Sequence, residues 1–275
     1  MTYATVMVNL KLYDSNDACL AVAADLVERF EAHVIGVAAS EFSPPPYFTD
    51  GVAAQRLLDE ADGAIRHRFA ELEAQFRTAM TPRAKTVEWR SALELPAAYV
   101  ARQARAADVV VSGQGSRELS DPFSQADADD LVMRAGRPLL IVPPSATWLD
   151  LRSCLIAWKD RPEARRAVAD ALPLLRRAKD VTIVEVPEHD GGRSAAQASV
   201  RDVAAWLARH GISATEVVPE RIGHATEQLD RIAATAGAGL LIAGAYGHSR
   251  LREWVLGGVT RHLLGRFDRC AVVAR

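Results

Sequence analysis

The chain has 275 residues, of which 49% are hydrophobic and 25% are charged. This length favours two domains, because single hydrophobic cores stop growing at roughly 250–300 residues. With 33 Lys and Arg against 35 Asp and Glu, no excess of charge indicates a nucleic-acid or anionic-lipid partner.

We expect neither a secretory leader nor a membrane segment. Its first residues lack a basic stretch followed by an apolar core and a cleavage site, and no run approaches the roughly 20 apolar residues of a spanning helix. The three cysteines, Cys19, Cys154 and Cys270, lie far apart and form no CxxC pair or Cys/His cluster. We therefore expect a cytoplasmic protein with reduced cysteines and no metal site.

The first half opens with an apolar run over Thr5–Lys11, which predicts a strand followed by a helix rich in Ala, Val and Leu. The Pro-rich segment Ser43–Phe48 cannot lie inside a helix or a central strand. It is either a lid or docking segment or, as we favour, a surface connection. The next segment, Gln55–Ala79, is predicted to be a long helix with an apolar stripe at Leu57, Leu58, Ala61, Ile65, Phe69, Leu72 and Phe76.

The first half ends with two further apolar strands, and a second half repeats its order. Val109–Val111 and Leu139–Val142 are matched later by Leu240–Ile242 and Arg269–Ala274. The opening strand Thr5–Lys11 is matched by Ser153–Lys159, and Val181–Val184 is a further apolar strand. Short, wholly apolar strands that alternate with amphipathic helices are typical of a parallel sheet buried on both faces.

The repeat predicts an α/β protein of two tandem doubly wound, mostly parallel-sheet domains, over residues 1–145 and 149–275. Thr5 matches Ser153, an offset of 148, whereas Gly113 matches Gly244, an offset of 131. The first half therefore holds 17 more residues (148 minus 131) between these points. We assign them to the Pro-rich segment and the long helix.

A glycine-rich loop follows the strand Leu240–Ile242 of the second half. In such sheets ligands bind beyond the C-terminal ends of the strands, where glycines allow positive φ and backbone amides face an anion. The loop is neither a P-loop nor a GxGxxG fingerprint. A turn that needs glycine and binds no ligand is the alternative. We favour a phosphate site formed by Gly244, Gly247, His248, Gly257, Gly258, Val259 and Thr260.

The spacing Gly244, Gly247, Gly257 resembles the Gly-x2-Gly-x9-Gly-Ser/Thr motif of the universal stress protein family, and the whole chain looks like its tandem form. The resemblance implies a stress-response role and ATP or a related nucleotide as ligand, with Mg²⁺ only if ATP is bound. It also implies pairing of the last strands, Leu139–Val142 and Ala271–Ala274, in an intramolecular pseudo-dimer of the two domains. Association into homo-oligomers, such as a dimer, is a further expectation.

Two departures from the family pattern weaken the implied phosphate site. Gly258 stands where the motif has Ser or Thr, which removes a hydroxyl. The family places an Asp after the first strand, on the adenine and ribose side, where this chain reads Ala157, Trp158, Lys159, Asp160. Lys159 could meet phosphate instead, and Trp158 could stack on a base or fill an interface between domains.

The first half matches the motif poorly. Its loop Gly113–Ser116 is followed by the acidic residues Asp127, Asp129 and Asp130, which would repel a phosphate. We expect this half to be a degenerate partner domain that binds no nucleotide.

Three functions remain open for the whole chain. The first is a stress-response binding protein with a nucleotide in its second domain. The second is an interaction or scaffold protein in which both sites have decayed. The third is a weak nucleotide hydrolase, which ranks last because no paired base and nucleophile can be identified and no catalytic residue is predicted.

Overall fold

The computed structural model describes residues 2–42, 51–114, 121–245 and 268–275. The chain forms two compact units, a first unit of Tyr3–Arg137 and a second unit made chiefly of Pro138–Arg275. The boundary precedes the strand Leu139–Val142, which therefore belongs to the second unit. The division predicted from the sequence, at 1–145 and 149–275, differs from this grouping at that strand and stays a prediction.

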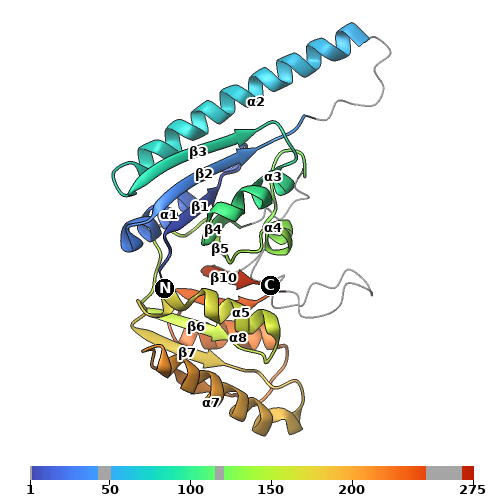
Figure 1. Ribbon diagram of the computed structural model, residues 1–275. Coiled ribbons are helices and arrows are strands. Elements are labelled where there is room, and N and C mark those ends of the chain that lie inside the picture. The colour runs from blue at the N-terminus through green and yellow to red at the C-terminus, as the bar shows by residue number, and fades with distance from the viewer. Residues whose placement is uncertain (1, 43–50, 115–120, 246–267) are drawn as a thin grey trace. The chain divides into compact units, whose positions relative to one another are not determined.

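The first unit contains a parallel sheet with the strand order β3-β2-β1-β4. Helix α1 packs beside α2, and α3 packs beside α4. Because crossovers between parallel strands are right-handed, the reversal of strand order at β1 places these two pairs on opposite faces of the sheet (Figure 1). The elements are β1 (Thr5–Asn9), α1 (Asp17–Phe30), β2 (His33–Ala39), α2 (Gly51–Met80), β3 (Thr86–Ala92), α3 (Pro96–Gln103), the 3₁₀ helix η1 (Ala104–Ala106), β4 (Val109–Gly113) and α4 (Ala128–Arg134).

The long helix predicted in the first half is α2, which has 30 residues against 17 in α7 (Arg193–Arg209), the corresponding helix of the second unit. Only its C-terminal part is buried. Ile65, Phe69 and Leu72 form a cluster with Leu12 and Ala38, whereas Leu57 and Leu58 are only partly buried. The Pro-rich segment Ser43–Phe48 lies outside the described residues.

The second unit contains six strands in the order β5-β10-β9-β6-β7-β8. All pairs are parallel except β10 with β5, which is antiparallel and joins Ala271 to Ile141 and Val273 to Leu139. The elements are β5 (Leu139–Val142), β6 (Ser153–Ala157), α5 (Pro162–Asp170), α6 (Leu172–Leu175), β7 (Asp180–Val184), the 3₁₀ helix η2 (Asp190–Gly192), α7 (Arg193–Arg209), β8 (Thr215–Val217), α8 (Ala225–Thr235), β9 (Leu240–Gly244) and β10 (Cys270–Ala274).

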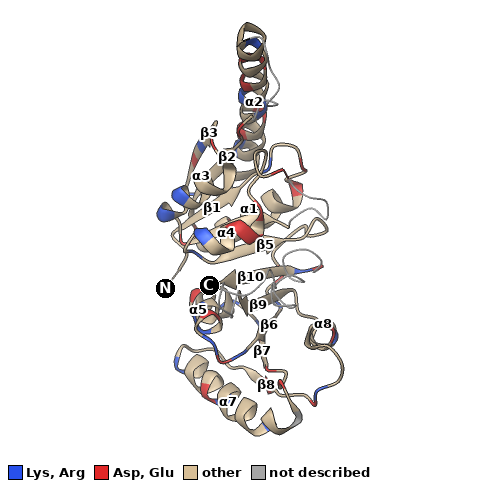
Figure 2. Ribbon diagram, turned by 90° about the vertical axis from the view of Figure 1, so that its right-hand side faces the viewer, with Lys and Arg blue, Asp and Glu red and all other residues tan. Residues whose placement is uncertain are grey.

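The strands next to the middle of each sheet carry no charged residue, and the charges lie on helices, loops and sheet edges (Figure 2). Strands β1, β4, β6 and β9 are almost wholly buried, as a sheet covered by helices on both faces requires. Most of the described helices carry both Arg and Asp or Glu. The prediction of two tandem, mostly parallel α/β domains is confirmed.

Candidate functional site

The strand order of the second unit reverses between β6 and β9. From β6 the chain moves outward to β7 and β8, and then returns to the other side of β6 as β9. Beyond the C-terminal ends of strands at such a reversal, an α/β sheet leaves a crevice in which ligands bind. The segment after Ala157 and the end of β9 at Gly244 border this crevice, and both were singled out in the sequence.

Gly244 ends β9 and lies directly against the first turn of α5. A Cβ at this position would lie 2.5 Å from the backbone nitrogen of Ala164 and 2.7 Å from the carbonyl carbon of Glu163. Gly244 is not among the glycines with positive φ, so the need for glycine here comes from close packing. The glycine-rich loop therefore begins beside the N-terminus of a nine-residue helix, whose amides carry a partial positive charge.

The rest of the glycine-rich loop lies outside the described residues. This applies to the predicted phosphate contacts Gly247, His248, Gly257, Gly258, Val259 and Thr260. Their assignment stays a prediction from the sequence.

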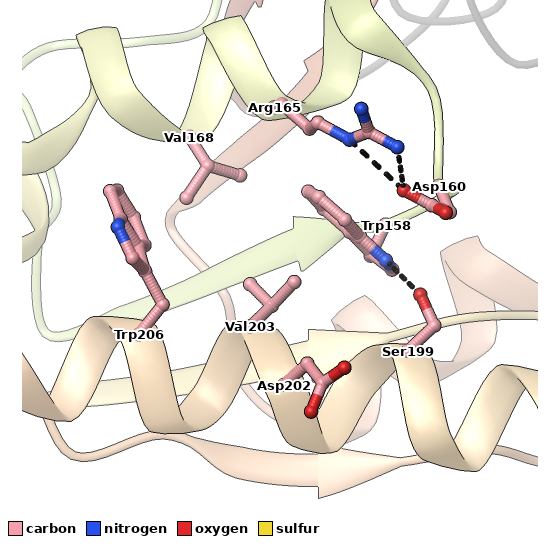
Figure 3. A pocket seen from close by; sticks show the side chains of 8 residues that line it. All are labelled: Trp158, Asp160, Arg165, Val168, Ser199, Asp202, Val203 and Trp206. Carbon is pink, nitrogen blue, oxygen red and sulfur yellow. Dashed lines mark hydrogen bonds and ion pairs between the residues drawn. The ribbon is translucent and has the colours of Figure 1, made fainter.

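Ala157 and Trp158 follow each other at the end of β6. Ala157 is aligned with Val184 of β7 and Ala243 of β9. The Trp158 backbone N–H donates to the Val184 carbonyl oxygen at 2.8 Å, and its indole Nε1 donates to Ser199 Oγ of α7, also at 2.8 Å. The indole is 7% exposed and lies between α5 and α7 (Figure 3). Trp158 therefore packs inside its own unit.

The two charged residues that follow Trp158 are each held in an ion pair. The Lys159 ammonium pairs with Glu188, and Arg165 Nε donates to Asp160 Oδ1 at 3.0 Å. Burial, together with the nearby Arg161, lowers the pKa of Lys159. Both side chains are about half exposed, so a ligand could displace either partner at the modest cost of a surface ion pair.

Glu185, which directly follows β7, was not singled out in the sequence. Its Oε2 is buried and has no hydrogen-bond partner within the described part of the chain. Burial raises the pKa of this carboxyl and nearby Asp160 raises it further, while a hydrogen bond from Ser199 and the charge of Lys159 oppose the shift. A charged residue right after a buried strand, next to β6 in a parallel sheet, was the signal available in the sequence.

The corresponding crevice of the first unit lies between β1 and β4, and a lysine of the chain occupies it. Lys11 is 5% exposed, and its ammonium donates to the carbonyl oxygen of Gln114 at 2.8 Å. It also pairs with Asp14 at 3.4 Å. The Lys11 side chain thus bridges the loops that follow the two strands, in the place where a ligand would enter.

Further hydrogen bonds close this crevice. Asn16 accepts from the Lys11 backbone N–H at 2.9 Å and donates to the Lys11 carbonyl oxygen at 2.8 Å. Asn9 Nδ2 donates to Ser112 Oγ at 3.0 Å and so ties β1 to β4. The acidic residues Asp129 and Asp130, which we expected to repel phosphate, lie in the first turn of α4, where the helix dipole favours them.

The described residues give little support for metal binding, membrane insertion or thiol chemistry. Among these residues no group of three His, Cys, Asp or Glu side chains could hold a metal ion, and no helix is long and apolar enough to cross a membrane. The three cysteines are free and buried, and burial raises the pKa of Cys19 and Cys154 to about 12. Neither thiol is therefore an activated nucleophile at neutral pH.

Comparison with known proteins finds solved structures with a similar fold. No protein-family model matches the chain, and no curated protein matches it. The crystal structure of a universal stress protein from Archaeoglobus fulgidus matches with a TM-score of 0.68 at 14% identity, covering 98% of both chains. A functionally unknown protein from Pseudomonas aeruginosa matches with a TM-score of 0.57 at 15% identity, covering 99% of this chain and 92% of that one. The resemblance stated from the sequence is thus confirmed at the level of the fold.

Proposed function

We propose that this chain, which has the fold of the universal stress proteins, is a stress-response binding protein whose second unit holds ATP or a related nucleotide in the crevice between β6 and β9. The observation that carries the proposal is the contrast between the two crevices. In the first unit Lys11 fills the crevice. In the second unit the corresponding residue after β6 is Lys159, whose side chain is about half exposed and pairs with Glu188.

Three features of the second unit fit a nucleotide. The N-terminal turn of α5 lies beside Gly244, where helix amides favour a phosphate. The buried Oε2 of Glu185 lacks a donor among the described residues, and an exocyclic amine of a purine would supply one. Lys159 lies close enough to Glu185 to influence its pKa and offers a cation for phosphate. Mg²⁺ would enter only together with ATP.

Calorimetric titration with ATP, alongside mass spectrometry of the small molecules released from the purified protein, tests this proposal. We expect heat of binding and a co-purifying nucleotide. Lys159→Ala should weaken ATP binding by about tenfold, a loss equal to one charge-assisted contact. Lys179→Ala is the matched control, because Lys179 is exposed just before β7, at the opposite end of the strands.

The alternative is an interaction or scaffold protein in which both sites have decayed. The ion pairs Lys159–Glu188 and Asp160–Arg165, which engage both charged side chains of the segment, favour it. Titration without heat and a preparation free of nucleotide would establish this alternative over nucleotide binding. Release of ADP over time by the purified protein would instead support the weak hydrolase, for which no catalytic residue is assigned.

The assembly and location of the chain belong to the same proposal. The antiparallel pairing of β5 with β10 supports an intramolecular pseudo-dimer built on the last strands of the two repeats. We further propose a cytoplasmic protein that forms homo-oligomers, which light scattering of the purified protein would test.

A further inference from the structure

A pocket of about 440 Å³ lies between α5 and α7 of the second unit (Figure 3). Its volume falls within the range of small-molecule sites, roughly 300–1,000 Å³. The lining residues that the structure describes come from α5, from α7 and from the segment after β6, and they all belong to the second unit.

Two indoles form opposite sides of the pocket. Figure 3 shows Trp158 and Trp206 facing each other across the space, with Val168 of α5 and Val203 of α7 between them. The hydrogen bond from Trp158 to Ser199 fixes one indole. An edge contact with His210, at 4.4 Å between ring centroids, orients the other. The aromatic walls are therefore positioned before any ligand arrives, which reduces the entropy cost of binding.

The charged residues of the lining that the structure describes leave one excess negative charge. Asp160 and Arg165 neutralise each other in their ion pair. Asp202, on the α7 side next to Val203, is exposed and makes no hydrogen bond or ion pair with the side chains that the structure describes. Indole faces carry negative potential and attract cations. The pocket thus joins two aromatic walls to one free carboxylate.

We infer that this pocket binds a small organic ammonium ion, with its apolar body between Trp158 and Trp206 and its charged head against Asp202. An apolar body fits Val168 and Val203, and a cationic head pairs with Asp202, the carboxylate left unpaired among the described lining residues. An anion would be repelled by Asp202. This ligand class is opposite in charge to a nucleotide, so the inference stands apart from the proposed function.

Phenethylammonium and its neutral isostere 2-phenylethanol are the probes that test this site on the full-length protein. Binding is followed by calorimetry and by the NMR signal of the Trp158 indole N–H. We expect phenethylammonium to bind about tenfold more tightly than 2-phenylethanol and to shift that signal. Equal affinity of the two probes, or no binding of phenethylammonium at millimolar concentration, would overturn the inference.

Two variants with matched controls assign the contacts. Asp202→Asn should weaken phenethylammonium about five- to tenfold and leave 2-phenylethanol unchanged, whereas Glu227→Gln, which removes an exposed carboxylate of α8, should change neither. Trp206→Leu should weaken both probes, and Trp148→Leu, outside the pocket, should weaken neither. An Asp202→Asn protein that binds phenethylammonium as tightly as the wild type refutes the role of Asp202. ATP titration of the same variants keeps this result separate from the fate of the nucleotide proposal.

Discussion

Gly244 and Gly113 hold matching positions at the ends of β9 and β4, but only Gly244 is pressed against a helix. A Cβ on Gly244 would overlap the backbone at Glu163 and Ala164, whereas one on Gly113 would meet only Lys11 Cε at 4.0 Å. We expect Gly244→Ala to lower the free energy of unfolding by about 1–3 kcal/mol, the cost of overpacking. Gly113→Ala should change it by less than about 1 kcal/mol. Urea denaturation measures both, and equal losses would show that α5 yields to the added methyl group.

Glu185 makes stability depend on pH, because its pKa is raised above the ordinary value of 4.5 in the folded protein. Preferential protonation of the folded state stabilises it below pH 4.5, and this contribution is lost as pH rises through the folded pKa. At pH 7 Glu185→Gln should therefore melt about 1–3 °C higher than the wild type. The difference should shrink toward pH 4.

Calorimetric melting between pH 4 and pH 8 measures the effect of Glu185→Gln. Glu216→Gln is the control, since Glu216 is exposed on β8. A lower melting temperature of Glu185→Gln at pH 7 would contradict the argument, because it would mean that the charged carboxylate stabilises the fold.

At the scale of elements, α2 is divided into a packed C-terminal part and an exposed N-terminal part. Leu72 is fully buried in the cluster with Phe69, whereas Val52 is 64% exposed. Leu72→Ala should cost about 2–5 kcal/mol of unfolding free energy, and Val52→Ala less than about 0.5 kcal/mol. Hydrogen exchange should show faster exchange of amides before Ile65 than after it. Uniform protection along α2 would mean that its N-terminal part is covered in solution.

Apolar strands and helix stripes were readable from the sequence because they depend on local pattern. Leu139–Val142 was predicted with its observed bounds, and the stripe of α2 was correct from Ile65 onward. The stripe was incomplete at Leu57 and Leu58, which remain only partly buried, because spacing marks a face of a helix and not what covers it. The division at residue 145 rests on Pro143 and Pro144 and stays a prediction, because no local pattern in the sequence reveals the pairing of β5 with β10.

The candidate site was only partly readable, because its chemistry depends on residues distant in sequence. The segments at Ala157 and Gly244 were found from their place after apolar strands. Ser199 of α7 accepts the hydrogen bond from Trp158, and Glu185, at the end of β7, lies near Lys159 and Asp160. No sequence motif marks either residue. Lys11 was not singled out either, since a lysine after a strand is usually solvated and here becomes buried through contacts with Gln114 and Asp14.

At the scale of the whole molecule, β5 decides where the chain can be cut. β10 is fully buried and pairs on one edge with β9 and on the other with β5. A fragment of residues 149–275 lacks β5 and leaves an apolar edge strand unpaired, which is a template for association between chains. A fragment of residues 138–275 keeps that edge of β10 paired. The edge strand of its sheet is then β5, which has only four residues and follows Pro138. Short edge strands and flanking prolines disfavour such association.

We therefore expect the longer fragment to be monomeric and the shorter one to form dimers or larger species in light scattering. Monomers of equal stability from both fragments would place the boundary after β5 and remove this strand from the second unit.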